Sequence, residues 1–106
     1  MTRSERAMQV WQVLISAASQ RRILTYGHLA EYLEFDGAGV FSQILDRIMQ
    51  YCDDNKLPPL TCIVVNRSTG LPGSGLSTIE NLPRDRENVF SHNWFAGPLV
   101  QIRDFE

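Results

Sequence analysis

Cys62 is the residue whose type most directly suggests chemistry, because a cysteine thiolate is a strong nucleophile. It lies in the segment LPPLTCIVVN (residues 57–66), where a proline pair precedes an apolar run. Its neighbours include Leu60, Ile63 and Val64, and burial among such residues raises the pKa of a thiol. No histidine stands beside it to activate it. We therefore expect Cys62 to be a small apolar residue in a buried strand and not a nucleophile.

The sequence lacks the spacing that metal or cofactor chemistry requires. His28 and His92 have no metal-ligand spacing with each other or with Cys52 and Cys62. The glycine-rich stretch GLPGSGL (residues 70–76) is not followed by the Lys-Ser/Thr pair of a phosphate-binding loop. We expect no catalytic residue, no metal ligand and no cofactor.

Arginines offer a different kind of chemistry, the recognition of phosphate. Arg21 and Arg22 stand just before a predicted short helix, where phosphate contacts are often made, and Arg67 lies in a predicted turn. Exposed loop arginines without a ligand are common, and that is the favoured interpretation of all three. Gln43 and Arg47 lie four residues apart on one predicted helix face and could contact base edges.

Acidic residues oppose DNA binding on that same helix. Asp46 lies between Gln43 and Arg47, and Asp53 and Asp54 follow further along. Their carboxylates would repel phosphate, so a solvated helix face is the favoured interpretation of this surface.

The totals predict one domain spanning residues 1–106, with 43% apolar residues for a single core. The net charge of -2 gives no global attraction to nucleic acid or to anionic membranes. The polar N-terminus does not resemble a signal peptide, and no apolar run approaches membrane-spanning length. We expect a cytoplasmic protein with reduced thiols and no membrane partner.

Apolar spacing predicts three helices in the first half of the chain. A stripe from Ala7 to Ala18 indicates the first, with Ser4 as its N-cap. Thr25 is expected to cap a short second helix over 26–33, and the FDGAG turn at 35–39 leads to a third over 40–54.

The second half is predicted to be shorter and more mixed. Residues 60–65 are rich in β-branched side chains and predict a strand, and NRSTG at 66–70 is turn chemistry. Residues 70–76 could form a return strand or an extended wing. A short helix is expected around 84–92, and residues 99–102 either add a strand or pack. This order predicts an α+β, mainly α, winged helix-turn-helix domain with a small β-hairpin wing. It also fits small α+β domains without a nucleic-acid partner.

Three segments carry a resemblance to a known family, namely LTYGHLAEYL, GAGVFSQIL and LPPLTCIVVNRSTGLPG. Across roughly residues 5–75 they resemble the DNA-binding domain of alkylguanine-DNA alkyltransferases, and still more the non-enzymatic alkyltransferase-like proteins. The resemblance implies a winged helix-turn-helix that binds DNA and recognises altered or flipped bases. It also implies that Tyr26 stacks on a base or bonds a phosphate, although an aromatic residue that only starts a helix explains Tyr26 equally well. The full set of predicted DNA-binding residues is Arg21, Arg22, Thr25, Tyr26, Gly27, Gln43, Arg47 and Arg67.

The chain departs from this family at its reactive centre. The family's P-C-H-R motif is absent; Thr61 falls at the cysteine position and Cys62 at the histidine position. The arginine that the family places early in its recognition helix is replaced here by Val40 or Phe41. Phe41 could act as an apolar wedge between bases, but it also fits the core stripe, which is the favoured interpretation.

The leading hypothesis is therefore a non-enzymatic DNA-binding protein of winged helix-turn-helix type. The alternative is a small acidic protein-interaction module that keeps the fold without DNA binding, such as an inhibitor protein from a mobile element. Its motivation is the negative net charge, the missing arginine and the acidic end of the third helix. A helix, the wing or the apolar GPLVQI segment near the C-terminus could serve as the partner surface. The sequence leaves the oligomeric state open.

Overall fold

The computed structural model describes residues 2–35, 38–72, 81–97 and 99–106. Within them the chain is mainly helical with one small parallel sheet, as the α+β, mainly α prediction expects. In chain order, with η denoting a 3-10 helix, the elements are α1 (Arg3–Ser19), β1 (Leu24–Thr25), α2 (Tyr26–Tyr32), α3 (Ala38–Asp54), η1 (Leu60–Ile63), β2 (Val64–Val65), α4 (Leu82–Ser91) and η3 (Ile102–Phe105).

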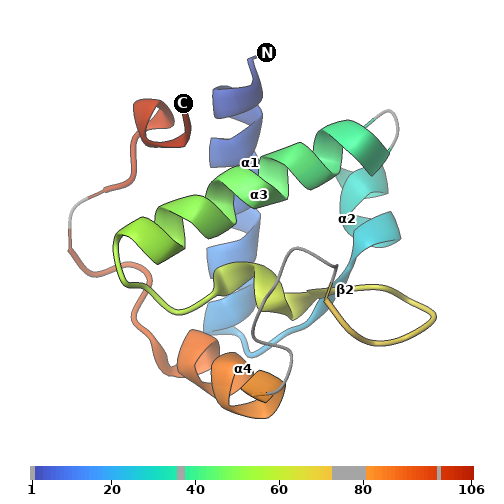
Figure 1. Ribbon diagram of the computed structural model, residues 1–106, viewed down its shortest axis with the longest axis vertical. Coiled ribbons are helices and arrows are strands. Elements are labelled where there is room, and N and C mark those ends of the chain that lie inside the picture. Colours follow the sequence, from blue (N-terminus) through green and yellow to red (C-terminus); the bar gives the residue numbers. More distant parts are fainter. Residues whose placement is uncertain (1, 36–37, 73–80, 98) are drawn as a thin grey trace.

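Two long helices form the centre of the fold. In Figure 1, α1 runs from the N-terminus towards α4 at the bottom of the view, and α3 crosses in front of it. The short helix α2 lies beside the N-terminal end of α3, and η3 lies beside the N-terminal half of α1. This arrangement leaves α4 and the end of α1 together at one end of the molecule.

The helix starts follow local capping chemistry. The N-cap of α1 is Thr2, whose side chain accepts from the main-chain N–H of Glu5 at 3.1 Å, while the Glu5 carboxylate accepts from that of Thr2 at 2.9 Å. The prediction of Ser4 as the cap is wrong, because Ser4 is a buried residue of the first turn. The prediction of Thr25 as the cap of α2 is confirmed, since its hydroxyl accepts from the N–H of His28.

The core is centred on Trp11, which α1 places between the other elements. Its ring lies 5.4 Å from Tyr51 on α3, 5.7 Å from Trp94 after α4 and 5.9 Å from Phe105 in η3. The indole N–H of Trp94 is also satisfied, because it donates to the main-chain oxygen of Val89 at 2.7 Å. These contacts hold the C-terminal segment onto both long helices.

The predicted strand over 60–65 is mostly wrong. Residues Leu60–Ile63 form the 3-10 helix η1, and only Val64 and Val65 are extended. β2 pairs in parallel with β1, in the register Leu24 to Val64 and Thr25 to Val65. The run is buried on every side, so alternation could not distinguish a strand from a helical turn.

In the described residues, the segment predicted as a β-hairpin wing does not form a paired hairpin. A single antiparallel bridge joins Val65 to Pro72 across the intervening turn. The segment 70–76 is expected to form a return strand or an extended wing, and its residues 73–76 lie outside the described residues. For residues 99–102 the predicted alternatives are a strand or simple packing; the structure has no strand there, Val100 packs against the core, and Ile102 begins η3. In the described part of the chain, no helix is long and apolar enough to cross a membrane.

Candidate nucleic-acid interface

The start of α2 presents the first group of predicted contact residues. Tyr26 is half-buried and packs edge-on against Phe41, with ring centroids 6.2 Å apart. Gly27 is exposed, and a Cβ added there would meet nothing within 4 Å. With Thr25 held by its capping bond, this turn offers an open stretch of backbone at the surface.

The predicted base-contacting pair on α3 is split by the fold. Gln43 is exposed, whereas Arg47 is half-buried and donates from Nη1 to the main-chain oxygen of Phe105 at 2.6 Å. Phe41 is only 3% exposed and stacks on Phe35 at 5.0 Å. Phe41 is thus a core residue, as the sequence favoured, and is not placed to act as a wedge.

The exposed surface of α3 is acidic. Asp46, Asp53 and Asp54 are all exposed, and Arg47 is turned towards the C-terminal segment. Negative charge along this helix opposes close approach of a phosphate backbone. Gln43 is therefore the one residue of the pair that α3 presents outwards.

Arg21 and Arg22 are positioned by the way α1 ends. The N–H of Arg21 donates to Ala18 O and that of Arg22 to Ala17 O, with Arg21 in the left-handed conformation at φ 57°. This ending turns the chain sharply from α1 into β1. As a result both arginines are exposed at the end of α1 that lies beside α4.

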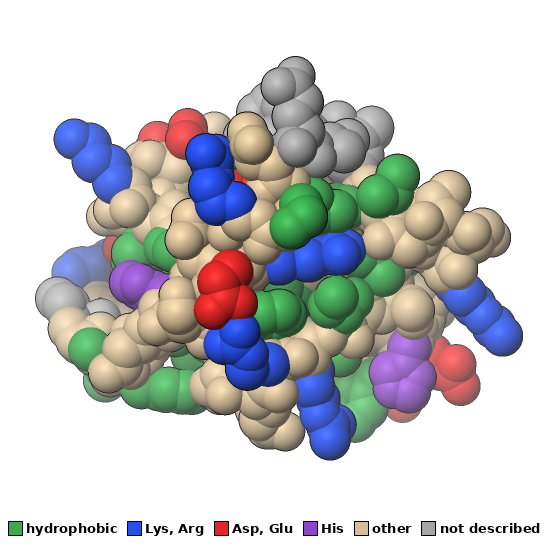
Figure 2. All heavy atoms as spheres, turned by 90° about the horizontal axis from the view of Figure 1, so that it is seen from below, with side chains coloured by type: hydrophobic (Ala, Val, Ile, Leu, Met, Phe, Trp, Pro, Cys, Tyr) green, Lys and Arg blue, Asp and Glu red, His purple; other side chains and the backbone are tan. Residues whose placement is uncertain are grey.

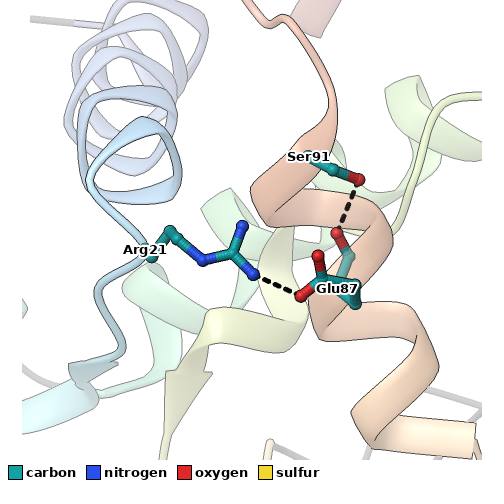
Figure 3. A network of polar contacts seen from close by, with 3 residues as sticks. All are labelled: Arg21, Glu87 and Ser91. Atoms are coloured by element: carbon teal, nitrogen blue, oxygen red, sulfur yellow. Dashed lines mark hydrogen bonds and ion pairs between the residues drawn. The ribbon is translucent and has the colours of Figure 1, made fainter.

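The Arg21 side chain reaches across to α4. Its guanidinium pairs with the carboxylate of Glu87 and lies 5.3 Å from the ring of Phe90. Figure 3 shows this pair. It also shows Ser91, one helical turn after Glu87, whose hydroxyl donates to the main-chain oxygen of Glu87. Both ionic side chains are more than half exposed, so the pair stays accessible to solvent.

Arg67 is presented by a tight turn after β2. The side chain of Asn66 accepts from the N–H of Ser68 at 2.8 Å, and its main-chain oxygen accepts from Gly70 at 2.7 Å. Gly70 adopts a positive φ of 69°, which glycine tolerates without strain. The turn leaves Arg67 exposed.

Helix α4 contributes two arginines that the sequence prediction missed. Arg86 donates from Nη2 to the main-chain oxygen of Gly70 at 3.1 Å, so it joins α4 to the turn that carries Arg67. Arg84 is two-thirds exposed one turn before Glu87. The PRDR segment was visible in the sequence. Its position beside α1 and the turn depends on tertiary packing, which periodicity does not report.

These contacts join the end of α1, the turn after β2 and α4, and the three segments together carry half of the basic residues of the chain. We call this surface the arginine face and define it as Arg21, Arg22, Arg67, Arg84 and Arg86. Figure 2 views the molecule from the α4 end and shows Lys and Arg side chains spread over it, with hydrophobic side chains and fewer Asp and Glu side chains between them. Two exposed apolar residues lie on these segments: Ile23 at 44% follows Arg22, and Leu71 at 43% follows Gly70, the acceptor of the Arg86 bond.

The two cysteines lie inside the core. Cys62 is 1% exposed. Its burial, and to a smaller extent the nearby Asp85 carboxylate, raise the pKa of its thiol to about 12. Burial likewise raises the pKa of Cys52 to about 11. The predicted burial of Cys62 is confirmed. Both thiols are protonated at neutral pH, which leaves them poor nucleophiles.

Comparisons with protein-family models, with curated proteins and with solved structures found no match to this chain. The similarity to alkyltransferase-like proteins therefore stays a prediction from the sequence segments that carry it.

Proposed function

We propose that this chain is a non-enzymatic DNA-binding protein of winged helix-turn-helix type. In this proposal α2 and α3 form the helix-turn-helix, and the turn after β2, closed by the bridge between Val65 and Pro72, serves as a small wing. The proposal is non-enzymatic because both thiols are buried and protonated. It includes the recognition of altered or flipped bases that the family resemblance implies.

One observation carries the proposal. Helix α4 links the end of α1 to the turn after β2, through the pair of Arg21 with Glu87 and the bond from Arg86 to Gly70. Arginines from three separate segments are thereby brought to one side of a chain whose net charge is -2. A local concentration of arginine in an acidic protein supports a phosphate-rich partner.

The test is fluorescence anisotropy with a labelled short duplex, either intact or carrying one alkylated guanine. We expect binding that weakens as salt rises from about 50 mM to about 200 mM, because released counterions drive the association. Arg22→Ala and Arg67→Ala should both bind more weakly. A preference for the alkylated duplex would support base recognition, and absence of binding at the lower salt concentration would refute the proposal.

A second candidate function is the protein-interaction module predicted as the alternative. The observation in its favour is the exposure of Phe95 at 64%, Leu99 at 88% and Ile102 at 44%, all in the segment after α4. Exposed apolar side chains of this size often mark contact surfaces. Self-association measured by light scattering, and its loss in Leu99→Ser, would support this candidate; a monomer at all concentrations would count against it.

A further inference from the structure

We propose that the arginine face, and not the exposed surface of α3, contacts the phosphate backbone of duplex DNA. This inference rests on the proposed function and deepens it, because it assigns the binding surface. It departs from the usual docking of a helix-turn-helix domain, in which the second helix of the motif enters the groove.

Charge is the first argument. The arginine face holds five guanidinium groups; Arg22, Arg67 and Arg84 are exposed, Arg86 is half-buried, and Arg21 is paired with the exposed carboxylate of Glu87. The other α4 carboxylate next to them in sequence is Asp85. Asp85 is only 6% exposed, so its charge is largely withdrawn from the surface. The surface of α3 instead exposes Asp46, Asp53 and Asp54. A polyanion is attracted to the first surface and repelled by the second.

Availability of the side chains is the second argument. Arg47 is the cation with which α3 could contact phosphate, but its Nη1 already donates to the main-chain oxygen of Phe105 at 2.6 Å. Phe41 is buried in the core. In contrast, Arg22, Arg67 and Arg84 are exposed. The described structure gives the side chains of Arg22 and Arg67 no hydrogen bond or ion pair, and Arg84 has only a 4.0 Å approach to Asp85. Exposed guanidinium groups can exchange water for phosphate oxygens without breaking the fold.

Rigidity is the third argument. The face is built from segments that are far apart in sequence but cross-linked. Arg86 ties α4 to the turn at Gly70, and α4 packs directly against α1. Fixed spacing lowers the conformational entropy lost on binding, so the arginines can engage neighbouring phosphates together.

The test compares matched single variants in the same anisotropy titration. Arg84→Ala represents α4, Arg22→Ala represents the end of α1, and Gln43→Ala represents α3. Arg103→Ala removes an exposed arginine from η3, beside α1 and α3, and serves as the charge control. Circular dichroism melting of each variant establishes that it is folded.

We expect Arg84→Ala and Arg22→Ala each to weaken binding about fivefold and to lower the slope of log K against log salt by about 1, the signature of one lost phosphate contact. The loss should be equal for two unrelated duplex sequences, because phosphate contacts carry no sequence information. Gln43→Ala and Arg103→Ala should bind as the unmodified chain does.

The outcomes separate this inference from the proposed function. If Gln43→Ala weakens binding and Arg84→Ala does not, the duplex lies on α3; the inference is then wrong and the proposed function survives. If Arg103→Ala weakens binding as much as Arg84→Ala, the effect is general charge, which also overturns the inference. If the unmodified chain binds no duplex at low salt, the proposed function itself fails.

Discussion

Arg47 on α3 donates a hydrogen bond from Nη1 to the main-chain oxygen of Phe105, 2.6 Å away in the C-terminal 3-10 helix. The bond fixes η3 beside α3 while the Phe105 ring fills the core next to Trp11 and Tyr51. A residue that looked like a base-contacting arginine in the sequence is therefore a structural tie.

Replacement of Arg47 should cost stability and leave DNA binding intact. We expect Arg47→Ala to lower the free energy of unfolding by about 1 kcal/mol, because a charge-assisted and partly buried hydrogen bond is lost. Urea denaturation followed by circular dichroism measures the change. Arg103→Ala, an exposed arginine of η3, should change stability by less than about 0.5 kcal/mol; an equal loss in both variants would contradict the assigned role.

Thr61 offers a test of the opposite sign. Thr61 is only 6% exposed and, in the described structure, its Oγ1 has no hydrogen-bond partner. We expect Thr61→Val to raise the free energy of unfolding by about 1 kcal/mol, because the unpaired hydroxyl is replaced by a methyl group of similar volume.

The matched control for Thr61 is Thr69, whose Oγ1 accepts from the N–H of Leu71 at 3.2 Å in the turn after β2. Thr69→Val removes a bond that exists, so it should be neutral or slightly destabilising. Thermal melts of the two variants give the comparison. A lower melting temperature for Thr61→Val would show that its hydroxyl is in fact satisfied.

The buried thiols predict a loss of stability at high pH. The folded-state pKa of Cys62 is raised from 9.0 to about 12 and that of Cys52 to about 11. Above pH 9 the thiols of the unfolded chain ionise first, which favours the unfolded state. The contribution of the buried thiols to folding stability is therefore fully present below pH 9 and is lost as pH rises through the folded pKa values. Stability measured from pH 8 upward should therefore fall from about pH 9 onward.

Two measurements isolate the thiols from the other groups that titrate at high pH. Cys62→Ala should flatten the fall relative to the parent chain, although it starts from a lower stability because a core side chain is shortened. A thiol reagent at pH 8 should label neither cysteine in the folded chain and both in urea. Rapid labelling of Cys62 in the folded chain would overturn the prediction and reopen thiol chemistry.

Glu87 carries a prediction about affinity. Its carboxylate holds Arg21 in an exposed pair, so removing its charge should cost little stability. On the proposed DNA surface the same change frees one guanidinium and removes one repulsive charge. We expect Glu87→Gln to tighten duplex binding about threefold at low salt, equivalent to about 0.6 kcal/mol.

The control for Glu87→Gln is Asp53→Asn, which removes the same charge from the exposed end of α3. Anisotropy titrations of both variants should show tighter binding only for Glu87→Gln. If Asp53→Asn gives the larger gain, the duplex lies nearer α3 than the arginine face.

The sequence predicted the helical part of this fold well because burial is one-sided there. The apolar stripe of α1 and that of α3 follow the helical period, and α3 begins at Ala38, two residues before the expected start. The short helix after Thr25 was predicted from its cap, which is a local signal.

The prediction failed where burial carries no pattern or where contacts are distant in sequence. Every residue of η1 is buried, so the β-branched run indicated a strand when a 3-10 helix forms. The bond from Arg47 to Phe105 and that from Arg86 to Gly70 span 58 and 16 residues. No local sequence rule links such distant pairs. For this reason the sequence patterns placed Arg47 on an exposed, base-contacting helix face and left α4 out of the candidate site.

The pairing of β1 with β2 has a consequence for the order of folding. Two α-helices and a 3-10 helix separate Leu24 from Val64 in the sequence, and their pairing forms a ladder of only two residue pairs. Closing so long a loop for so few bonds is unfavourable until α1 and α3 have docked. The sheet should therefore form after the rate-limiting step. In stopped-flow experiments, Val65→Ala should accelerate unfolding while leaving the refolding rate almost unchanged.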